Sequence, residues 1–315
     1  MKVFVAGATG ALGKQLVPQL VAAGHDVVGM TRSPDKRDAV RALGATPVVA
    51  DAVDPDAVAQ AVAEAEPEVI VHQLTALGGV LDMRHIDRYF AVTNRLRTEG
   101  TDHLLAAGRA VGARRFVAQS YAGWPFARTG GPVKDENDPL DPHPPERLRA
   151  ALDAIRHLED AVTTIDWGVG IVLRYGGFYG PGTSVSADPD GEMTEPVRKR
   201  QFPVIGGGEG VWSFTHIADA AAATVAAVDQ GEAGIYNVVD DEPARVRDWL
   251  PGLAQAVDAK PPRRLPRWLG RLVVGEAATV MMTQVRGASN AKAKRELHWQ
   301  PHYPNWHVGF AEGLR

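Results

Sequence analysis

Three glycines near the N-terminus, Gly7, Gly10 and Gly13, have the spacing of a turn that could bind a phosphate. They follow the apolar run at residues 3–5 and precede a helical pattern that we expect from Leu12 to Ala23. A buried strand, a glycine turn and a helix start direct backbone N–H groups into the turn, which suits a pyrophosphate. A tight turn would also require a glycine, but the strand and helix around it favour a dinucleotide site. The residues expected to contact the phosphates are Gly7, Thr9, Gly10, Ala11, Leu12 and Gly13.

The end of the second expected strand indicates which dinucleotide binds. About 20 residues after the glycines, an NAD site usually carries an acid that binds the ribose hydroxyls. Here the chain has Thr31, Arg32 and Ser33 instead. A guanidinium can bind a 2′-phosphate through two charge-assisted hydrogen bonds, whereas a carboxylate would repel it. These residues therefore favour NADP(H), and Lys36 and Arg37 either add positive potential or form an exposed helix face.

The pattern Gly-x-x-Gly-x-x-Gly resembles the extended and atypical short-chain dehydrogenase/reductase (SDR) families, not the Gly-x-Gly-x-x-Gly of ordinary Rossmann dehydrogenases. The resemblance recurs in segments 92–101, 174–182, 214–220 and 287–301, and so covers nearly the whole chain. It implies a Rossmann fold with a substrate lobe.

The resemblance also implies further cofactor contacts. Asp51 would face the adenine amine, although a helix N-cap is the other interpretation of an acid there; Asp54, before Pro55, fits a cap better. His72 is interpreted as a packed strand residue. The remaining residues expected along the cofactor are Ala52, Gln73, Leu74, Thr75, Gln119, Tyr175, Gly176 and Gly177.

The expected catalysts are only partly present. In the family, the fifth strand ends in Ser or Thr, here Ser120, which would orient a substrate oxygen. The next helix should carry Tyr-x-x-x-Lys, whose ammonium lowers the phenol pKa. Aligning Glu159 with the family's helix puts Ala151 and Ile155 at these two positions, and no Tyr or Lys occurs between residues 134 and 175. The sequence therefore resembles an atypical SDR.

Two tyrosines could replace the missing proton donor. Tyr121 directly follows Ser120, and Tyr175 follows Arg174. Tyr121 is the preferred donor, with packing against Trp124 in a loop as the alternative interpretation. A phenol without a neighbouring Lys keeps a pKa near ~10, which suits an acid better than a base.

Apolar runs that alternate with helical stretches predict a doubly wound α/β fold around a parallel sheet. The predicted strands are residues 3–5, 26–30, 46–49, 69–72, 115–118, 170–173 and 235–239. We expect a Rossmann domain at 1–180 with a return segment at about 213–240, and a substrate lobe at 181–212 and 241–315. The Gly- and Pro-rich segment 129–145 is predicted to be a long loop over the site.

The lobe segments suggest an apolar substrate. Residues expected to roof the pocket are Phe202, Trp212, Trp268, Leu272, Val273, Met281 and Met282. An apolar roof suits a hydrophobic or aromatic molecule better than a nucleotide sugar. In segment 214–220 we expect Asp219, near His216, to close a structural hydrogen-bond network. The histidines of segment 298–307 are interrupted by prolines and lack carboxylates, so no metal site is predicted.

Composition excludes several classes of protein. The 315 residues are 45% hydrophobic and carry 34 basic and 38 acidic side chains, a net charge of −4, which predicts no nucleic-acid or membrane binding. The absence of cysteine excludes thiol nucleophiles and disulfides. The first strand begins at Lys2, which predicts a cytoplasmic protein. The family resemblance implies a homodimer through the helices near 94–111 and 146–162.

These observations predict an NADP(H)-dependent oxidoreductase that moves a hydride to or from a small, largely apolar carbonyl or activated alkene. A non-catalytic NADP(H)-binding regulator is the alternative, because it would explain the missing Tyr-Lys pair. A redox-neutral epimerase or dehydratase ranks last, because it usually requires that base.

Overall fold

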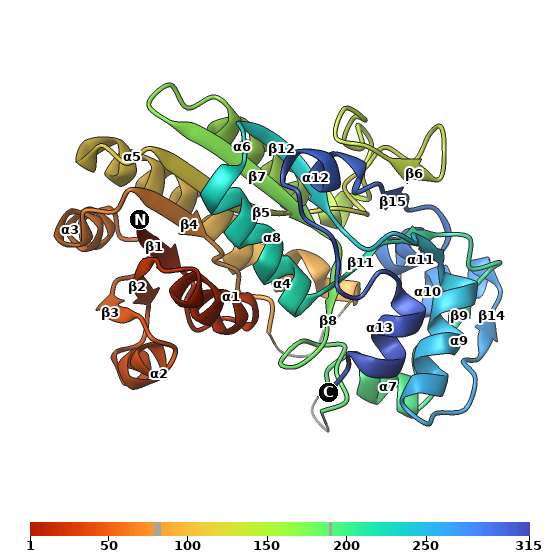
Figure 1. Cartoon of the computed structure of the whole chain (residues 1–315). Coiled ribbons are helices and arrows are strands. Elements are labelled where there is room, and N and C mark those ends of the chain that lie inside the picture. The colour runs from red at the N-terminus through yellow and green to blue at the C-terminus, as the bar shows by residue number, and fades with distance from the viewer. Residues whose placement is uncertain (79–82, 189–190) are drawn as a thin grey trace.

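The computed structural model describes residues 1–78, 83–188 and 191–315, and its centre is a seven-stranded parallel sheet (Figure 1). The strand order is β12-β7-β5-β4-β1-β2-β3, and all neighbours are parallel. The strands are β1 (Lys2–Ala6), β2 (Asp26–Thr31), β3 (Thr46–Val49), β4 (Val69–His72), β5 (Arg115–Tyr121), β7 (Val169–Tyr175) and β12 (Gly234–Val238). The predicted parallel, doubly wound α/β fold is confirmed.

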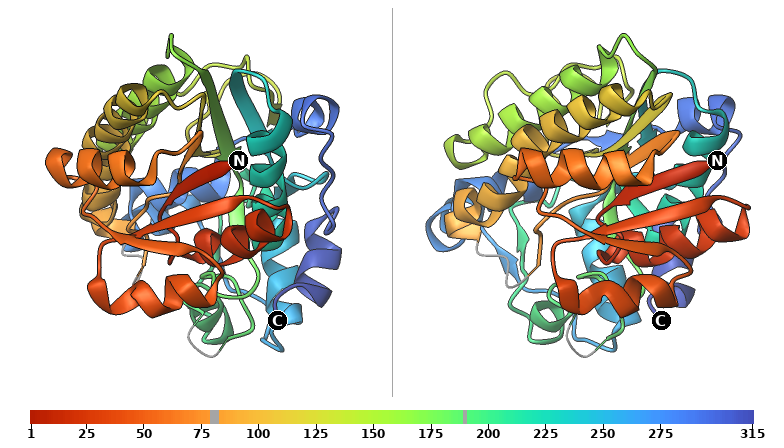
Figure 2. Two further views of the ribbon diagram at one scale, coloured as in Figure 1. Left: turned by 60° about the vertical axis from the view of Figure 1, so that its left-hand side comes forward. Right: turned by 90° about the vertical axis from the view of Figure 1, so that its left-hand side faces the viewer.

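Helices cover both faces of this sheet, as Figure 2 shows. Alternate residues of β1 point to opposite faces. Val3 and Val5 pack in a core with α1 (Ala11–Ala22) and α8 (Ile217–Gln230). Phe4 and Ala6 pack in a second core with α3 (Pro55–Ala65), α5 (Thr101–Val111) and α6 (Arg149–Thr163). A sheet buried on both faces explains why its strands are continuous apolar runs.

The N-termini of α3 and α1 differ in how their backbone N–H groups are capped. Oδ1 of Asp54 accepts the N–H groups of Asp56 and Ala57 at 3.1 Å, so Asp54 is the N-cap of α3, as predicted. By contrast, no side chain caps α1, which begins after Gly10. None of the described helices combines the length and the apolar character needed to cross a membrane.

A smaller set of elements lies beyond the carboxyl ends of the strands, on the right of Figure 1. Its core gathers around Trp249, Phe214 and Phe310. The helices are α7 (Thr194–Arg198), α9 (Val246–Ala256), α10 (Arg267–Val273), α11 (Glu276–Thr283) and α13 (Trp306–Glu312). The short strands are β8 (Gly177–Tyr179), β9 (Val204–Ile205), β10 (Val211–Trp212), β11 (Phe214–His216), β13 (Ala244–Arg245) and β14 (Arg264–Leu265). Three further α-helices of the described residues are α2 (Arg37–Ala42), α4 (Ile86–Arg95) and α12 (Ala291–Glu296).

Two segments differ from their expected places. Within segment 241–315, α12 packs beside β12, and Ala293, Leu297 and Trp299 belong to the core of the main sheet. Segment 129–145 does not border the site described below: its β6 (Val133–Lys134) pairs with β15 (Gly287–Ala288), and Glu136 accepts the N–H of Asn237. Edge pairing, which the sequence pattern does not reveal, holds this loop beside β12.

Candidate active site

The glycine turn after β1 packs closely against the neighbouring backbone and leaves the start of α1 open. Gly7 has φ +100°, and a Cβ there would lie 2.9 Å from the carbonyl oxygen of Gln73. A Cβ on Gly13 would lie 2.3 Å from the carbonyl oxygen of Gly7. Because α1 has neither a side-chain cap nor an acid in its first turn, its first N–H groups are available to an anion.

A groove of about 980 Å³ runs from this turn along the carboxyl ends of the strands; we call it the cofactor groove. Nearly all the predicted cofactor residues line it: Gly7, Thr9, Gly10, Ala11, Leu12, Thr31, Arg32, Ser33, Asp51, Ala52, Gln73, Leu74, Thr75, Gln119, Tyr175, Gly176 and Gly177. Gly13 does not line the groove; it lies buried against the turn's backbone, where its lack of a side chain lets α1 pack closely.

The end of the groove at β2 is positively charged. Arg32 and Lys36 line it and are exposed, and among the described residues no side chain pairs with Arg32. The carboxylate of Asp51 also lines this end, where it accepts the N–H of Val53. At the middle of the groove, both polar atoms of the Gln73 carboxamide are buried without a hydrogen-bond partner. A glycine cradle, free cations and an unpartnered amide fit a nicotinamide dinucleotide.

Ser120 does not have the predicted role. Its hydroxyl donates to Oε1 of Glu159 at 2.7 Å, and it borders neither the groove nor the pocket described below. Arg174 donates to both oxygens of the same carboxylate, at 2.7 and 2.6 Å. Ser120 and Arg174 share the strand face that packs on α6, which carries Glu159. Ser120 therefore belongs to a buried ion-pair network and is directed away from substrate.

Tyr175 is also unsuited to donate a proton to substrate. Tyr175 lines the groove, but its phenol lies 2.7 Å from Oγ1 of Thr224, on α8. Because the Thr224 hydroxyl donates to the carbonyl of Ala220 at 2.7 Å, the Tyr175 phenol is the donor to Thr224. Burial raises the pKa of Tyr175 well above its usual range. The proton of Tyr175 is held within the core.

Tyr121 reaches the cofactor groove at the end of β5. Its side chain lines the groove, and no described residue hydrogen-bonds its phenol. Burial raises the pKa of Tyr121 to about 12, an effect that the neighbouring Arg97 opposes. Ala151 and Ile155 of α6 are buried and apolar, so that helix supplies neither a phenol nor an amine at these positions. Tyr121 is the donor that remains from the sequence analysis.

Arg97 is a site residue that the sequence analysis missed. It lies in a π-helical turn, Leu96–Gly100, between α4 and α5, a kind of turn frequent at functional sites. Only 4% of the residue is exposed, and Nε and Nη1 have no hydrogen-bond partner. Burial lowers the pKa of the guanidinium to about 10. It lies four residues after buried Thr93 and four before buried Thr101, on the inner face of the helical segment.

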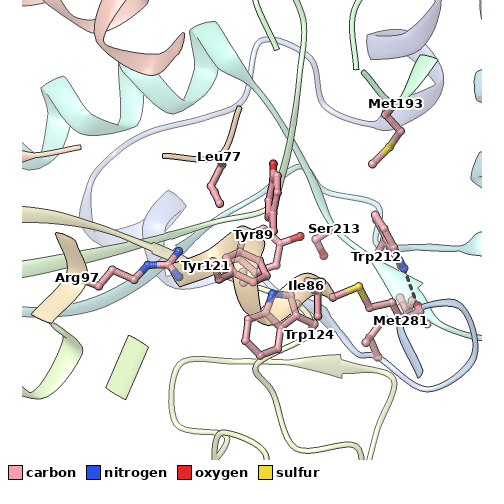
Figure 3. Close-up of a pocket in the computed structure, with 15 residues that line it drawn as sticks. Leu77, Ile86, Tyr89, Arg97, Tyr121, Trp124, Met193, Trp212, Ser213 and Met281 are labelled. Atoms are coloured by element: carbon pink, nitrogen blue, oxygen red, sulfur yellow. Dashed lines mark hydrogen bonds between the residues drawn. The ribbon is translucent and has the colours of Figure 1, made fainter. Parts of the chain in front are cut away.

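A second cavity of about 160 Å³, the aromatic pocket, adjoins the groove (Figure 3). Tyr121, Arg97, Tyr89, Leu77, Met193 and Trp212 border both. The other lining residues are mostly apolar and include Ile86, Phe90, Trp124, Val211, Met281 and Val285. Trp212 is fixed by its indole N–H, which donates to the carbonyl of Met281 at 2.9 Å. In Figure 3 the side chain of Arg97 extends toward Tyr121.

Only part of the expected roof is present. Trp212 and Met281 line the pocket, whereas Phe202 and Met282 pack in the core of the smaller lobe. The other three residues lie on α10 and face outward: Trp268 is 67% exposed, Leu272 70% and Val273 47%. Helix α4 supplies Ile86, Tyr89 and Phe90 to the pocket wall. The sequence did not indicate this, because the pattern of these residues is that of an ordinary amphipathic helix.

Two histidines of the sequence analysis have structural roles. His72 is buried; Nδ1 accepts the N–H of Leu74, and Nε2 lies 3.2 Å from the carbonyl of Leu96. Burial lowers the pKa of His72 to about 4, so the ring is neutral. His216 caps α8 through Nδ1, while the carboxylate of Asp219 accepts two backbone N–H groups, from His302 and Tyr303. The predicted structural role of Asp219 is confirmed.

Comparison with known proteins agrees with this architecture. Residues 3–239 match the model of the NAD dependent epimerase/dehydratase family. The chain is 47% identical over 311 residues, 98% of its length and 99% of the relative's, to a protein of a Streptomyces species named 3-diazoavenalumate denitrifying reductase.

Two more distant similarities extend this comparison. A 4-hydroxy-2-methyl-3-oxo-4-farnesyl-3,4-dihydroquinoline-1-oxide ketoreductase of Stigmatella aurantiaca is 27% identical over 79% of this chain and 71% of its own. The crystal structure of UDP-glucose 4-epimerase with UDP-glucose from Thermotoga maritima superposes with a TM-score of 0.76 at 20% identity, over 100% of this chain and 97% of that one. The family match, the glycine turn and the parallel sheet together show that the chain belongs to the NAD dependent epimerase/dehydratase family, as an extended SDR oxidoreductase.

Proposed function

We propose that this oxidoreductase uses NADPH to reduce a small, planar, largely apolar electrophile, a conjugated carbonyl or an activated alkene. The observation that supports this most strongly is the junction at Tyr121, where the cofactor groove meets the aromatic pocket. When bound, a nicotinamide would supply the hydride. The protein's own residues would position the electrophile beside the groove and provide a proton.

The preference for NADPH is supported by the end of β2. Arg32 is exposed, lines the groove and has no partner among the described residues, so its guanidinium is available to a 2′-phosphate. Thr31 and Ser33 beside it carry no charge that would repel a phosphate. Lys36 adds a second cation to the same wall.

The size of the aromatic pocket supports a one-ring substrate. At about 160 Å³ it is close to the volume of an engineered apolar cavity, about 150 Å³, that binds benzene. Tyr89, Phe90, Trp124 and Trp212 offer faces and edges against which a planar ring can pack. A nucleotide sugar would exceed this space.

Tyr121 would act as an acid. With its pKa raised to about 12, the phenol stays protonated at neutral pH and can donate to the oxygen on which negative charge develops. The same pKa makes it a poor base, which argues against an epimerase or dehydratase that must remove a proton. Loss of the phenol hydroxyl should lower kcat by about 10²-fold or more.

Aromatic diazo compounds are a second candidate substrate class. The relative with 47% identity over almost the entire chain is named as a denitrifying reductase of a diazo compound. A one-ring aromatic diazo compound that carries a ring oxygen is a planar electrophile that would fit the same pocket. Hydride would add to the ring carbon from which N₂ leaves, and a proton would be taken up by the ring oxygen. The relative named as a ketoreductase supports the carbonyl class instead.

The test is oxidation of NADPH with a panel of aromatic ketones, enones and aromatic diazo compounds, followed by identification of the product. We expect turnover with at least one class, a preference for NADPH over NADH, and a large loss of kcat in Tyr121→Phe. Tyr236→Phe is the matched control, because its hydroxyl bonds to Glu232 at the edge of the sheet. Tight NADPH binding without oxidation by any class would contradict the proposal and favour the regulator.

A further inference from the structure

Arg97 carries a buried positive charge that forms no ion pair within residues 1–78, 83–188 and 191–315. Its Nε and Nη1 are buried and have no hydrogen-bond partner, although the side chain borders both the groove and the aromatic pocket. Transfer of a charged guanidinium from water to the protein interior costs free energy, and apolar neighbours do not compensate for this cost.

The nearest carboxylate is already used. Glu159 is the acid whose charge acts on Arg97, but its Oε1 accepts from Ser120 and from Arg174, and its Oε2 accepts from Arg174 again. Arg174 is fully paired in charge with Glu159 and lies over the ring of Phe126. Two guanidinium groups therefore share one carboxylate, and an excess positive charge remains at Arg97.

The aromatic pocket supplies no acid to balance this charge. Its lining residues include no carboxylate. The phenol of Tyr121 experiences the charge of Arg97, and Tyr89 borders the same two cavities. Glu192, whose charge acts on Tyr89, lines the groove and not this pocket, so an anionic ligand in the pocket would supply a negative charge there.

The cofactor does not provide that charge in the proposed arrangement. A dinucleotide carries its anionic groups on the pyrophosphate and the 2′-phosphate, which the glycine turn and Arg32 are suited to bind. The nicotinamide end, which the strand order leads us to place near Tyr121, carries no anion. The unpaired nitrogens of Arg97 are therefore available to substrate.

We propose that Arg97 is a specificity-determining residue that binds an anionic oxygen, phenolate or carboxylate, carried by the one-ring substrate. This inference rests on the proposed function of the aromatic pocket. A planar guanidinium binds such an oxygen through charge-assisted hydrogen bonds, which a neutral carbonyl cannot match. A neutral aromatic of the same shape leaves the buried cation unpaired and binds more weakly, by ~10- to 100-fold.

The test compares anionic and neutral one-ring probes in the presence of NADP⁺. Benzoate and para-nitrophenolate represent the two sources of the anion, and benzamide and nitrobenzene are their neutral counterparts. Binding is measured by calorimetry and by the fluorescence of Trp124 and Trp212, which line the pocket. For the wild-type protein we expect at least one anion to bind ~10- to 100-fold more tightly than its neutral counterpart.

Three variants locate the preference. Arg97→Met should abolish it while retaining the affinity for the neutral probe, and Arg97→Lys should keep part of it. Arg95→Met is the matched control, because it removes the same charge from an exposed ion pair with Glu99 and should leave the preference unchanged. The wild-type comparison requires no variant and so does not depend on how a substitution folds.

The outcomes separate this inference from the function on which it rests. Equal affinity of the wild-type protein for anionic and neutral probes would overturn the role of Arg97 while leaving a one-ring pocket. A preference that persists in Arg97→Met would do the same. If no aromatic probe binds to the wild-type protein, the proposed substrate class itself is wrong.

Discussion

Replacing Arg97 by Met should stabilise the protein in the absence of ligands. The wild-type guanidinium is almost fully buried, and its pKa falls from its ordinary value of 12.5 to about 10. At ~1.4 kcal/mol per pKa unit, this fall corresponds to about 3 kcal/mol by which the folded state disfavours the charge. Methionine keeps the length and much of the packing of the aliphatic stem without that charge.

The pKa of about 10 already includes the attraction between Arg97 and Glu159. The net gain should nevertheless be smaller than this penalty, because methionine does not replace all the packing of the larger arginine side chain. We expect an increase of ~1–2 kcal/mol in the free energy of unfolding. For a chain of this length, this corresponds to a rise in Tm of about 2–3 °C. The gain would show that the wild-type residue is retained at a cost in stability, as functional residues often are.

Urea unfolding and thermal melts of the ligand-free proteins measure this effect. Arg97→Lys retains the charge and should show no gain. Arg95→Met breaks only an exposed ion pair and should change stability by less than ~1 kcal/mol. A lower Tm for Arg97→Met than for the wild-type protein would show instead that the guanidinium stabilises the fold and is satisfied within it.

Further predictions concern the ion-pair network, the buried histidine and the cofactor. Glu159→Gln should lower the free energy of unfolding by ~3–5 kcal/mol, because it leaves the buried Arg174 without its carboxylate. Ser120→Ala should lower it by only ~1–2 kcal/mol. Equal losses for the two variants in denaturant unfolding would show that Arg174 does not depend on Glu159. The pKa of His72 in the folded state, about 4, lies below its ordinary value of 6.5, so neutral His72 contributes stability above pH 6.5 that is lost as the pH falls through 4. Stability measured across this range should fall more in the wild-type protein than in His72→Gln. Arg32→Ser should reduce the preference for NADPH over NADH by ~10- to 100-fold in binding assays, and an unchanged ratio would place the 2′-phosphate elsewhere.

Much of the cofactor half of the site was predictable, because it depends on backbone and on strand order. The groove residues directly follow strands that the sequence shows as apolar runs. Two of these strands, β3 and β4, have the predicted boundaries. Gly7 and Gly10 then lie where a parallel sheet places its ligands, beyond the carboxyl ends of its strands.

The catalytic half depends on which way individual side chains point. Ser120 and Tyr121 are adjacent on β5, so they point to opposite faces, and Ser120 shares the face of Phe116 and Ala118 toward α6. Tyr175 shares the face of Ile171 and Leu173 toward α8. A family resemblance assigned Ser120 by its position, but the strand alternation would have identified it as buried.

Arg97 could not be recognised from residue types alone. A charged residue in a helical segment usually faces solvent, as Arg95 does two positions earlier. The π-helical turn that begins at Leu96 changes the direction of the side chains that follow, and the sequence does not show that turn. Only the structure shows that Glu159 pairs with Arg174 and that Nε and Nη1 of Arg97 have no partner.

The proposed reduction of a small planar electrophile at the junction of the two cavities requires transfer of a hydride from C4 of the nicotinamide. NADPH with deuterium at both C4 positions allows this label to be followed into the products of aromatic ketones, enones and aromatic diazo compounds. We predict that deuterium appears in one product class, at a rate that falls sharply in Tyr121→Phe and not in Tyr236→Phe. Retention of all the deuterium in bound NADPH, with every class of electrophile, would show that the chain does not reduce these compounds.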